Sequence, residues 1–174
     1  MFIYISKLDS AKRQLEMAIK LYFGNHDPVS IHTLTCASYN ILKGIGKKQN
    51  IKPIIKSTDY IKPGMEKRYL DIVSEAENFF KHGCKDSNKL LKFNPEITLT
   101  LIYDACHMYY KLTSEYTFLM TILKGWFSVN NLEVIKNGQY KKKIKLIKNI
   151  SPTNRTDFYN KFKDLENHTT IKII

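Results

Sequence analysis

The sequence predicts an all-α protein, a single-domain helical bundle of about five to six helices. Apolar residues recur at three- and four-residue spacing in several segments, which is typical of amphipathic helices. Capping residues, prolines and glycines separate those segments at the places where helices begin and end. The composition is 43% hydrophobic and 25% charged, which is typical of a globular protein and excludes a disordered chain.

Two helices are predicted in the N-terminal part of the chain. The first covers residues 8–22, where an apolar stripe is interrupted by charged residues, and Gly24 ends it. Asp27 is the predicted N-cap of the second helix, because its carboxylate can accept a hydrogen bond from a free amide of the first turn. We expect Gly44 and Gly46 to end this second helix.

The middle of the chain predicts a basic connection followed by two further helices. Residues 47–63 combine lysines with prolines and predict a loop. The third helix covers about residues 65–82 and is ended by Gly83. Asn94 is the predicted cap of the fourth helix, whose apolar face continues to Leu112.

The C-terminal third of the chain is predicted to be less regular. Ser114 and Glu115 are expected to begin a fifth helix, and a short last helix is expected from Thr153 onward. We interpret residues 128–174 as a basic extension of one domain that covers residues 1–174, because single cores of this length are common.

The sequence predicts a cytoplasmic protein without membrane association. No apolar run approaches the roughly 20 residues that a membrane-spanning helix needs, and the start of the chain does not resemble a signal peptide. The three scattered cysteines, Cys36, Cys84 and Cys106, fit a reducing compartment. The sequence has neither a Gly-rich phosphate loop nor a nucleophile elbow, and we expect no cofactor.

The formal charge of +12 favours contact with a polyanion such as RNA. Three of the 28 basic residues are arginine. Specific recognition of phosphates and bases relies on the planar fork of arginine, so the attraction is expected to be non-specific. The lysine runs at 43–56 and 136–148 are either solvated loops or contacts to a nucleic-acid backbone. The residues predicted to contact nucleic acid are Lys81, Lys141, Lys142, Lys143 and Lys145.

Two polar residues stand at the end of the predicted third helix and are the candidate catalytic residues. Asn78 and His82 are four residues apart, so their side chains share one helical face. His82 can act as a general acid or base near neutral pH, with Asn78 orienting it or a phosphate oxygen. The alternative is a histidine that the helix dipole favours at a C-terminus, beside an asparagine on a wet face.

Four blocks of the chain resemble a family of uncharacterised bacterial proteins that share them in the same order, over about residues 7–113. The blocks are "KLDSAKRQLEMAIKLYF", "DPVSIHTLTCASYNIL", "AENFFKHGCKD" and "FNPEITLTLIYDACHMYYKLT". An asparagine followed four residues later by a histidine near a helix end is also similar to the HEPN superfamily of small helical bundles. That resemblance implies a homodimer in a stress, defence or RNA-processing setting and, in active members, metal-independent ribonuclease chemistry.

The HEPN motif carries over to this chain with one departure. His82 matches the histidine of the motif, and Asn78 matches the polar residue that follows its arginine. The arginine itself is expected at position 77, which is Glu. A carboxylate at that position repels a phosphate. The resemblance therefore implies a HEPN-like scaffold that binds RNA or a partner protein, with ribonuclease activity left open.

Two further interpretations compete with this preferred one. In the first, the chain is a structural or interaction module with no catalytic activity, and its histidines only pack or cap helices. In the second, it is a metal-binding helical bundle, because His32 lies in the second helix and Asp104 and His107 are three residues apart in the fourth. A lone histidine on an apolar helix, such as His32, is more often a core residue than a metal ligand.

Overall fold

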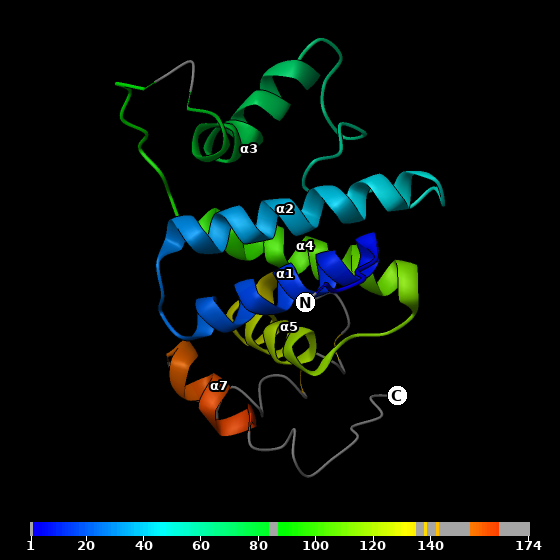
Figure 1. The fold of residues 1–174 in the computed structure, drawn as a ribbon, viewed down its shortest axis with the longest axis vertical. Helices are drawn as coiled ribbons and strands as arrows, with labels where there is room; N and C mark the ends of the chain where they lie inside the picture. The colour runs from blue at the N-terminus through cyan, green and yellow to red at the C-terminus, as the bar shows by residue number, and fades with distance from the viewer. Residues whose placement is uncertain (1, 84–86, 135–137, 139–141, 143–153, 164–174) are drawn as a thin grey trace.

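Helices make up the regular structure in the part of the chain that the structure describes. The computed structural model describes residues 2–83, 87–134, 138, 142 and 154–163. These residues contain no strand, which confirms the all-α fold class. The elements with described bounds are α1 (Lys7–Phe23), α2 (Pro28–Lys47), α3 (Glu66–Lys81), α4 (Glu96–Thr113), α5 (Phe118–Asn130), the 3-10 helix η1 (Leu132–Val134) and α7 (Arg155–Lys163) (Figure 1).

The core lies between α1, α2, α4 and α5, which pack on one another. Each of these helices turns its apolar stripe inward, as the spacing predicts, and each such buried side chain contributes about 1.5–3 kcal/mol. The large side chains that are fully buried here are Leu15, Ile19 and Phe23 of α1, Tyr39 and Leu42 of α2, Leu101, Ile102 and Met108 of α4, and Met120 and Leu123 of α5.

Helix α3 stands apart from the core, on the side of α2 that faces away from α1 and α5 (Figure 1). No residue of α3, which the structure describes in full, is fully buried. An aromatic cluster attaches its C-terminal end, where Phe80 meets the rings of His32 and Phe93 edge to face at 5.8 and 5.1 Å between centroids. Along the rest of α3, Tyr69 and Glu77 make polar contacts to the preceding segment and to α2, and the apolar side chains of Leu70, Val73 and Ala76 are half-buried.

Helix α7 packs on α1 and α5 at the other end of the bundle (Figure 1). Phe158 is buried against Trp126, with 5.3 Å between ring centroids. The indole N–H of Trp126 donates to the Tyr22 hydroxyl at 3.1 Å, which satisfies the buried polar atom of that ring. The Thr156 hydroxyl donates to the Phe23 carbonyl oxygen at 2.7 Å and ties α7 to the end of α1.

The prediction that Gly44 and Gly46 end the second helix is wrong, because α2 continues to Lys47. Gly46 is buried, and its carbonyl oxygen accepts a hydrogen bond from the Ile51 amide at 2.9 Å. A Cβ at position 46 would lie 2.9 Å from the Ile51 carbonyl oxygen, which is too close. Gly46 therefore permits the chain to fold back onto the helix, and it does not stop the helix.

The start of the fifth helix also differs from the prediction. Ser114 ends α4 in a left-handed conformation, with φ of 60°, and its amide donates to the Tyr110 carbonyl oxygen at 2.7 Å. The N-cap of α5 is Thr117, whose hydroxyl accepts from the Met120 amide. Both residues have side chains that suit a cap, and the left-handed turn at Ser114 decides which of them begins the helix.

Parts of the predicted C-terminal extension lie outside the described residues. Residues 128–130, where it was expected to begin, form the last turn of α5. The last helix begins at Arg155, and its predicted start at Thr153 lies outside the described residues. Cys84 also lies outside them. Among the residues that are described, no helix is long and apolar enough to cross a membrane.

Candidate functional site

A buried carboxylate on α4 anchors the irregular connecting segment, residues 48–65, that joins α2 to α3. Asp104 is 1% exposed. It accepts hydrogen bonds from the Tyr39 hydroxyl at 2.5 Å and from the backbone amides of Ile54 and Ile55 at 2.8–3.0 Å. An ionised carboxylate is expensive to bury unless charge-assisted hydrogen bonds of this kind surround it. The position of the connecting segment is therefore coupled to the core.

Tyr39 links Asp104 to one more residue of the connecting segment, Lys56. Burial, together with the hydrogen bond to Asp104 and the negative charge of Asp104, raises the pKa of Tyr39 far above its usual value. The phenol therefore stays protonated and donates to Asp104, while its oxygen accepts from the Lys56 amide at 3.1 Å. The Tyr69 hydroxyl donates to the Ile55 carbonyl oxygen, so the start of α3 is bound to the same stretch of chain.

The anchor places Lys56 against Glu77 of α3 in a largely buried ion pair. Their side chains are 4% and 11% exposed. The Asn40 side-chain amide donates to the other carboxylate oxygen of Glu77, and the Lys56 ammonium lies 5.4 Å from the centre of the Tyr39 ring. Burial raises the pKa of Glu77, but the hydrogen bond and charge of Lys56, with the Asn40 bond, more than offset this, and the pKa is lowered overall. Glu77 is therefore ionised and is neutralised locally.

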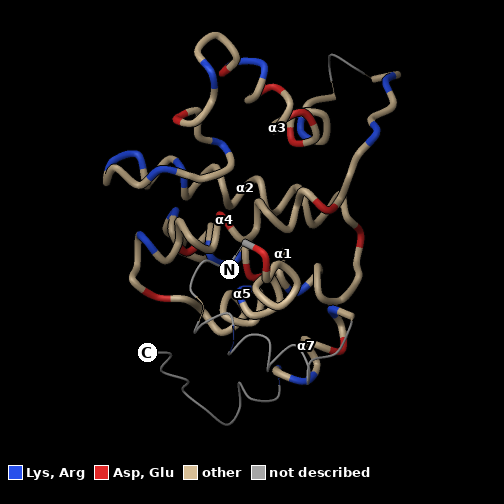
Figure 2. Tube along the Cα trace, turned by 180° about the vertical axis from the view of Figure 1, so that it is seen from behind, with Lys and Arg blue, Asp and Glu red and all other residues tan. Residues whose placement is uncertain are grey.

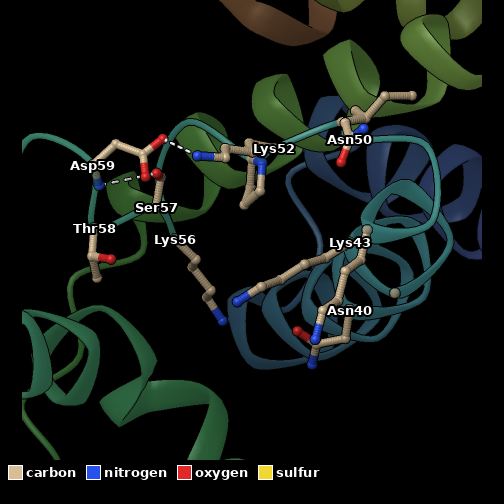
Figure 3. Close-up of a pocket in the computed structure, with 12 residues that line it drawn as sticks. Asn40, Lys43, Asn50, Lys52, Lys56, Ser57, Thr58 and Asp59 are labelled. Carbon is tan, nitrogen blue, oxygen red and sulfur yellow. Dashed lines mark hydrogen bonds and ion pairs between the residues drawn. The ribbon is translucent and has the colours of Figure 1, made fainter.

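A cavity of about 480 Å³ opens between the C-terminal half of α2 and the connecting segment. Four lysines line it and define what we call the lysine pocket: Lys43, Lys47, Lys52 and Lys56. Figure 3 shows Lys43 reaching from α2 and Lys56 from the connecting segment into the same space. The other lining residues are Asn40, Gly44, Asn50, Ile51, Pro53, Ser57, Thr58 and Asp59.

The lysines of this pocket differ in their partners. Lys52 pairs with Asp59 at 2.8 Å, and Lys56 pairs with Glu77. Lys43 and Lys47 are exposed and form no ion pair with any described residue. In Figure 2, lysine and arginine positions gather at the C-terminal end of α2 and on the connecting segment. The pocket therefore carries excess positive charge and can bind an anion.

A smaller cavity of about 300 Å³ adjoins the lysine pocket on the side of α3. The two cavities share Asn40, Lys43 and Lys56 as lining residues. The smaller one is also lined by five α3 residues, namely Leu70, Asp71, Ser74, Glu77 and Asn78. Its wall is more acidic than that of the lysine pocket, so an anion is expected to prefer the latter.

The candidate catalytic residues lie at the C-terminal end of α3. Asn78 lines the smaller cavity, whereas His82 is the residue that follows the helix and does not line either cavity. The His82 amide donates to the Asn78 carbonyl oxygen at 3.1 Å, which places the two residues one turn apart. His82 is exposed, and its backbone is extended.

The predicted nucleic-acid contacts are placed only in part. Lys81, in the last turn of α3, and Lys142 are exposed. Lys141, Lys143 and Lys145 lie outside the described residues. The lysines that the structure brings together around a cavity come from the other run that the sequence indicates, residues 43–56.

The weak metal alternative does not come together in the described part of the chain. His32, Asp104 and His107 do not form a cluster, and no group of three or more His, Cys, Asp or Glu side chains that could hold a metal ion occurs among the described residues. Asp104 uses its oxygens to accept from Tyr39 and from two backbone amides. His107 is half-buried on α4.

His32 is a core histidine, and both of its ring nitrogens have a polar neighbour. It is 1% exposed, and its Nδ1 lies 2.9 Å from the Thr98 hydroxyl. Its Nε2 lies 3.4 Å from the Cys36 sulfur. The rings of Phe80 and Phe93 pack against it, so His32 joins α2, α3 and the chain before α4.

Burial, assisted by the positive charge of Lys56, lowers the pKa of His32 to about 4, although Glu77 acts in the opposite direction. Burial also raises the pKa of Cys36 to about 12, which leaves a neutral thiol that is a poor nucleophile. These two groups are therefore structural, in spite of their reactive residue types.

The polar residues that build the site were only partly found from the sequence. The sequence predicts Asp104 only as an alternative metal ligand, identifies Glu77 as a departure from the motif, and indicates no role for Tyr39. A usable signal exists, because Asp104 lies on the stripe formed by Leu101, Ala105 and Met108. A lone carboxylate on an apolar helix face requires buried donors.

Comparison with protein-family models, with curated proteins and with solved structures finds no match. The resemblance to the HEPN superfamily therefore stays a prediction.

We predict that His32→Gln makes stability less sensitive to acid. Folded His32 stays neutral down to about pH 4, whereas the unfolded chain takes up the proton below about pH 6.5. The free energy of unfolding therefore decreases as the pH is lowered through this window. This decrease is up to about 1.4 kcal/mol per pH unit steeper in the wild type than in the variant. Urea unfolding at a series of pH values measures both slopes.

The matched control is His26→Gln, which removes an exposed histidine outside the core and so separates the loss of a buried imidazole from the loss of any histidine. Equal slopes for the wild type and His32→Gln would contradict the assignment of His32 as a neutral core residue.

Proposed function

We propose that the protein binds the phosphate backbone of RNA in the lysine pocket. The observation that carries this proposal is the pair Lys43 and Lys47, which line a cavity beside α2 and whose ammonium groups have no ion-pair partner among the described residues. The side-chain amides of Asn40 and Asn50 add polar groups at the same cavity. Lysines of this kind attract phosphates without reading the sequence, because binding releases counterions from the nucleic acid.

The other two lysines of the pocket, Lys52 and Lys56, each form an ion pair with an acidic residue. The buried Lys56–Glu77 pair ties the connecting segment to α3, and the exposed Lys52–Asp59 pair joins two positions within the segment itself. The Lys52 pair is exposed, and such surface pairs contribute little stability. A phosphate can therefore share Lys52 at little cost, while Lys56 stays with its buried partner.

Lys81 and the run from Lys141 to Lys145 are proposed to add attraction outside the pocket. Lys81 is close enough to Glu77 to help lower the pKa of that carboxyl, so it belongs to the same basic neighbourhood. Lys142 is exposed. Ammonium groups that lie near an occupied pocket raise affinity through the same salt-dependent effect.

Metal-independent ribonuclease activity at Asn78 and His82 is the second candidate function. One observation favours it: Asn78 lines the cavity that shares Lys43 and Lys56 with the lysine pocket, so RNA held there passes near the end of α3. The carboxylate at position 77 repels phosphate less than the sequence implies, because Lys56 neutralises it. His82 is exposed and accessible to a bound backbone.

A homodimer in the cytoplasm is also part of the proposal. Helix α3 is the element with room for a second copy, since none of its residues is fully buried and Ile72 is 62% exposed. Cys36 and Cys106 are both buried as free thiols, which fits a reducing compartment. The alternative, an interaction module with no chemistry, requires a protein partner in place of RNA.

The test of RNA binding is a charge-matched comparison. The logarithm of the binding constant falls linearly with the logarithm of the salt concentration. Lys43→Gln combined with Lys47→Gln should make this negative slope shallower by about 1.4, that is, by about 0.7 for each lost contact to a single strand. Fluorescence anisotropy with a labelled mixed-sequence oligoribonucleotide, at several salt concentrations, measures the slope.

The control is Lys20→Gln combined with Lys163→Gln, which removes the same charge from exposed positions on α1 and α7. An equal loss in both double variants would show a diffuse attraction and would contradict a site in the lysine pocket.

The ribonuclease proposal is tested by incubating single-stranded RNA with the protein in EDTA. We expect cleavage by the wild type, loss of cleavage with His82→Ala, and wild-type cleavage with His26→Ala, which replaces another exposed histidine. Absence of cleavage by the wild type would remove this second function and would leave RNA binding unaffected.

A further inference from the structure

An exposed tyrosine stands at the edge of the lysine pocket. Tyr60 is 96% exposed, and it directly follows Thr58 and Asp59, which line the pocket. Its phenol lies close enough to Lys52 to help raise the pKa of that ammonium, after the larger effect of Asp59. An aromatic ring and a phosphate-binding cavity are therefore neighbours on this surface.

The backbone holds Tyr60 in a defined place. The Ile61 amide donates to the Thr58 carbonyl oxygen at 3.0 Å, so Tyr60 sits inside a tight turn. The exposed Lys52–Asp59 ion pair joins this turn to an earlier part of the same connecting segment. The turn fixes the backbone of Tyr60, while its ring is open to solvent and to a ligand.

A ring in this setting has a specific use with nucleic acids. The flat face of a base stacks on an aromatic side chain, and this contact does not depend on the identity of the base. A base inside a duplex is covered on both faces by its neighbours and cannot offer one. Phosphate contacts alone, in contrast, form with both single and double strands.

We infer that Tyr60 stacks on an unpaired base of an RNA strand whose phosphates lie on Lys43, Lys47 and Lys52, so that the protein selects single-stranded over double-stranded RNA. This inference rests on the proposed binding of RNA in the lysine pocket and adds the class of RNA that the pocket takes. The lysines supply attraction, and the tyrosine supplies the choice between strands.

The test compares Tyr60→Leu with the wild type on a single-stranded RNA and on a duplex of the same sequence. We expect the variant to bind the single strand about 5- to 150-fold more weakly, the range for loss of one stacked base, and to bind the duplex as the wild type does. Tyr60→Phe should keep the wild-type affinity for both. Substitution of so exposed a residue is not expected to disturb folding.

A second readout follows from Tyr60→Trp. Trp126 is the single tryptophan of the chain and is buried, so the difference in emission between Tyr60→Trp and the wild type reports on position 60. Single-stranded RNA should quench its fluorescence, and the duplex should not.

Two results separate the inference from the proposal that it rests on. If Tyr60→Leu binds the single strand as the wild type does, while the Lys43→Gln and Lys47→Gln variant binds it more weakly, the stacking role is wrong and the lysine pocket stands. If the wild type fails to bind single-stranded RNA even at low salt, the proposed function is itself wrong.

Discussion

The rest of the site depends on the hydrogen bonds that the buried carboxylate of Asp104 accepts. An ionised carboxylate without partners would cost several kcal/mol in this position. Its partners are the Tyr39 hydroxyl and the amides of Ile54 and Ile55, which belong to a segment without regular structure. The cost of burying the charge is thus offset only when that segment lies against α2 and α4. An internal charge therefore specifies the course of a surface loop.

Placement of the loop has consequences for both α3 and the pocket. Once the backbone at Ile54 and Ile55 is fixed, the next side chain, Lys56, reaches Glu77, and α3 is bound to α2 through Asn40 as well. Helix α3 buries no residue fully, and it is held by these polar contacts, by the aromatic cluster at its end and by half-buried apolar side chains such as Leu70. The same loop forms one wall of the lysine pocket, while α2 forms the other. The lysine pocket therefore exists only while the hydrogen bonds to Asp104 hold the connecting segment in place.

The helices could be predicted because their signals are local. Apolar spacing and the cap at Asp27 depend on residues within one or two turns, and the structure has both. The start of α5 was missed because Ser114 and Thr117 both suit a cap, and a left-handed turn chooses between them. The site was found only in part because its contacts join residues about 20 to 65 positions apart, as between Tyr39 and Asp104. Lysine density indicates two runs of chain, and only tertiary contacts determine that the lysines of the 43–56 run lie around a cavity and which of them remain unpaired.

Hydrogen exchange of the Ile54 and Ile55 amides, measured by NMR, tests the anchor most directly. Amides in an irregular surface segment normally exchange fast, whereas amides that donate to a buried carboxylate are protected until the surrounding structure opens. We expect both amides to exchange as slowly as the buried amides of α2 and α4, although the Ile54 side chain is 56% exposed. Exchange at the rate of an open loop would contradict the anchor and, with it, the lysine pocket.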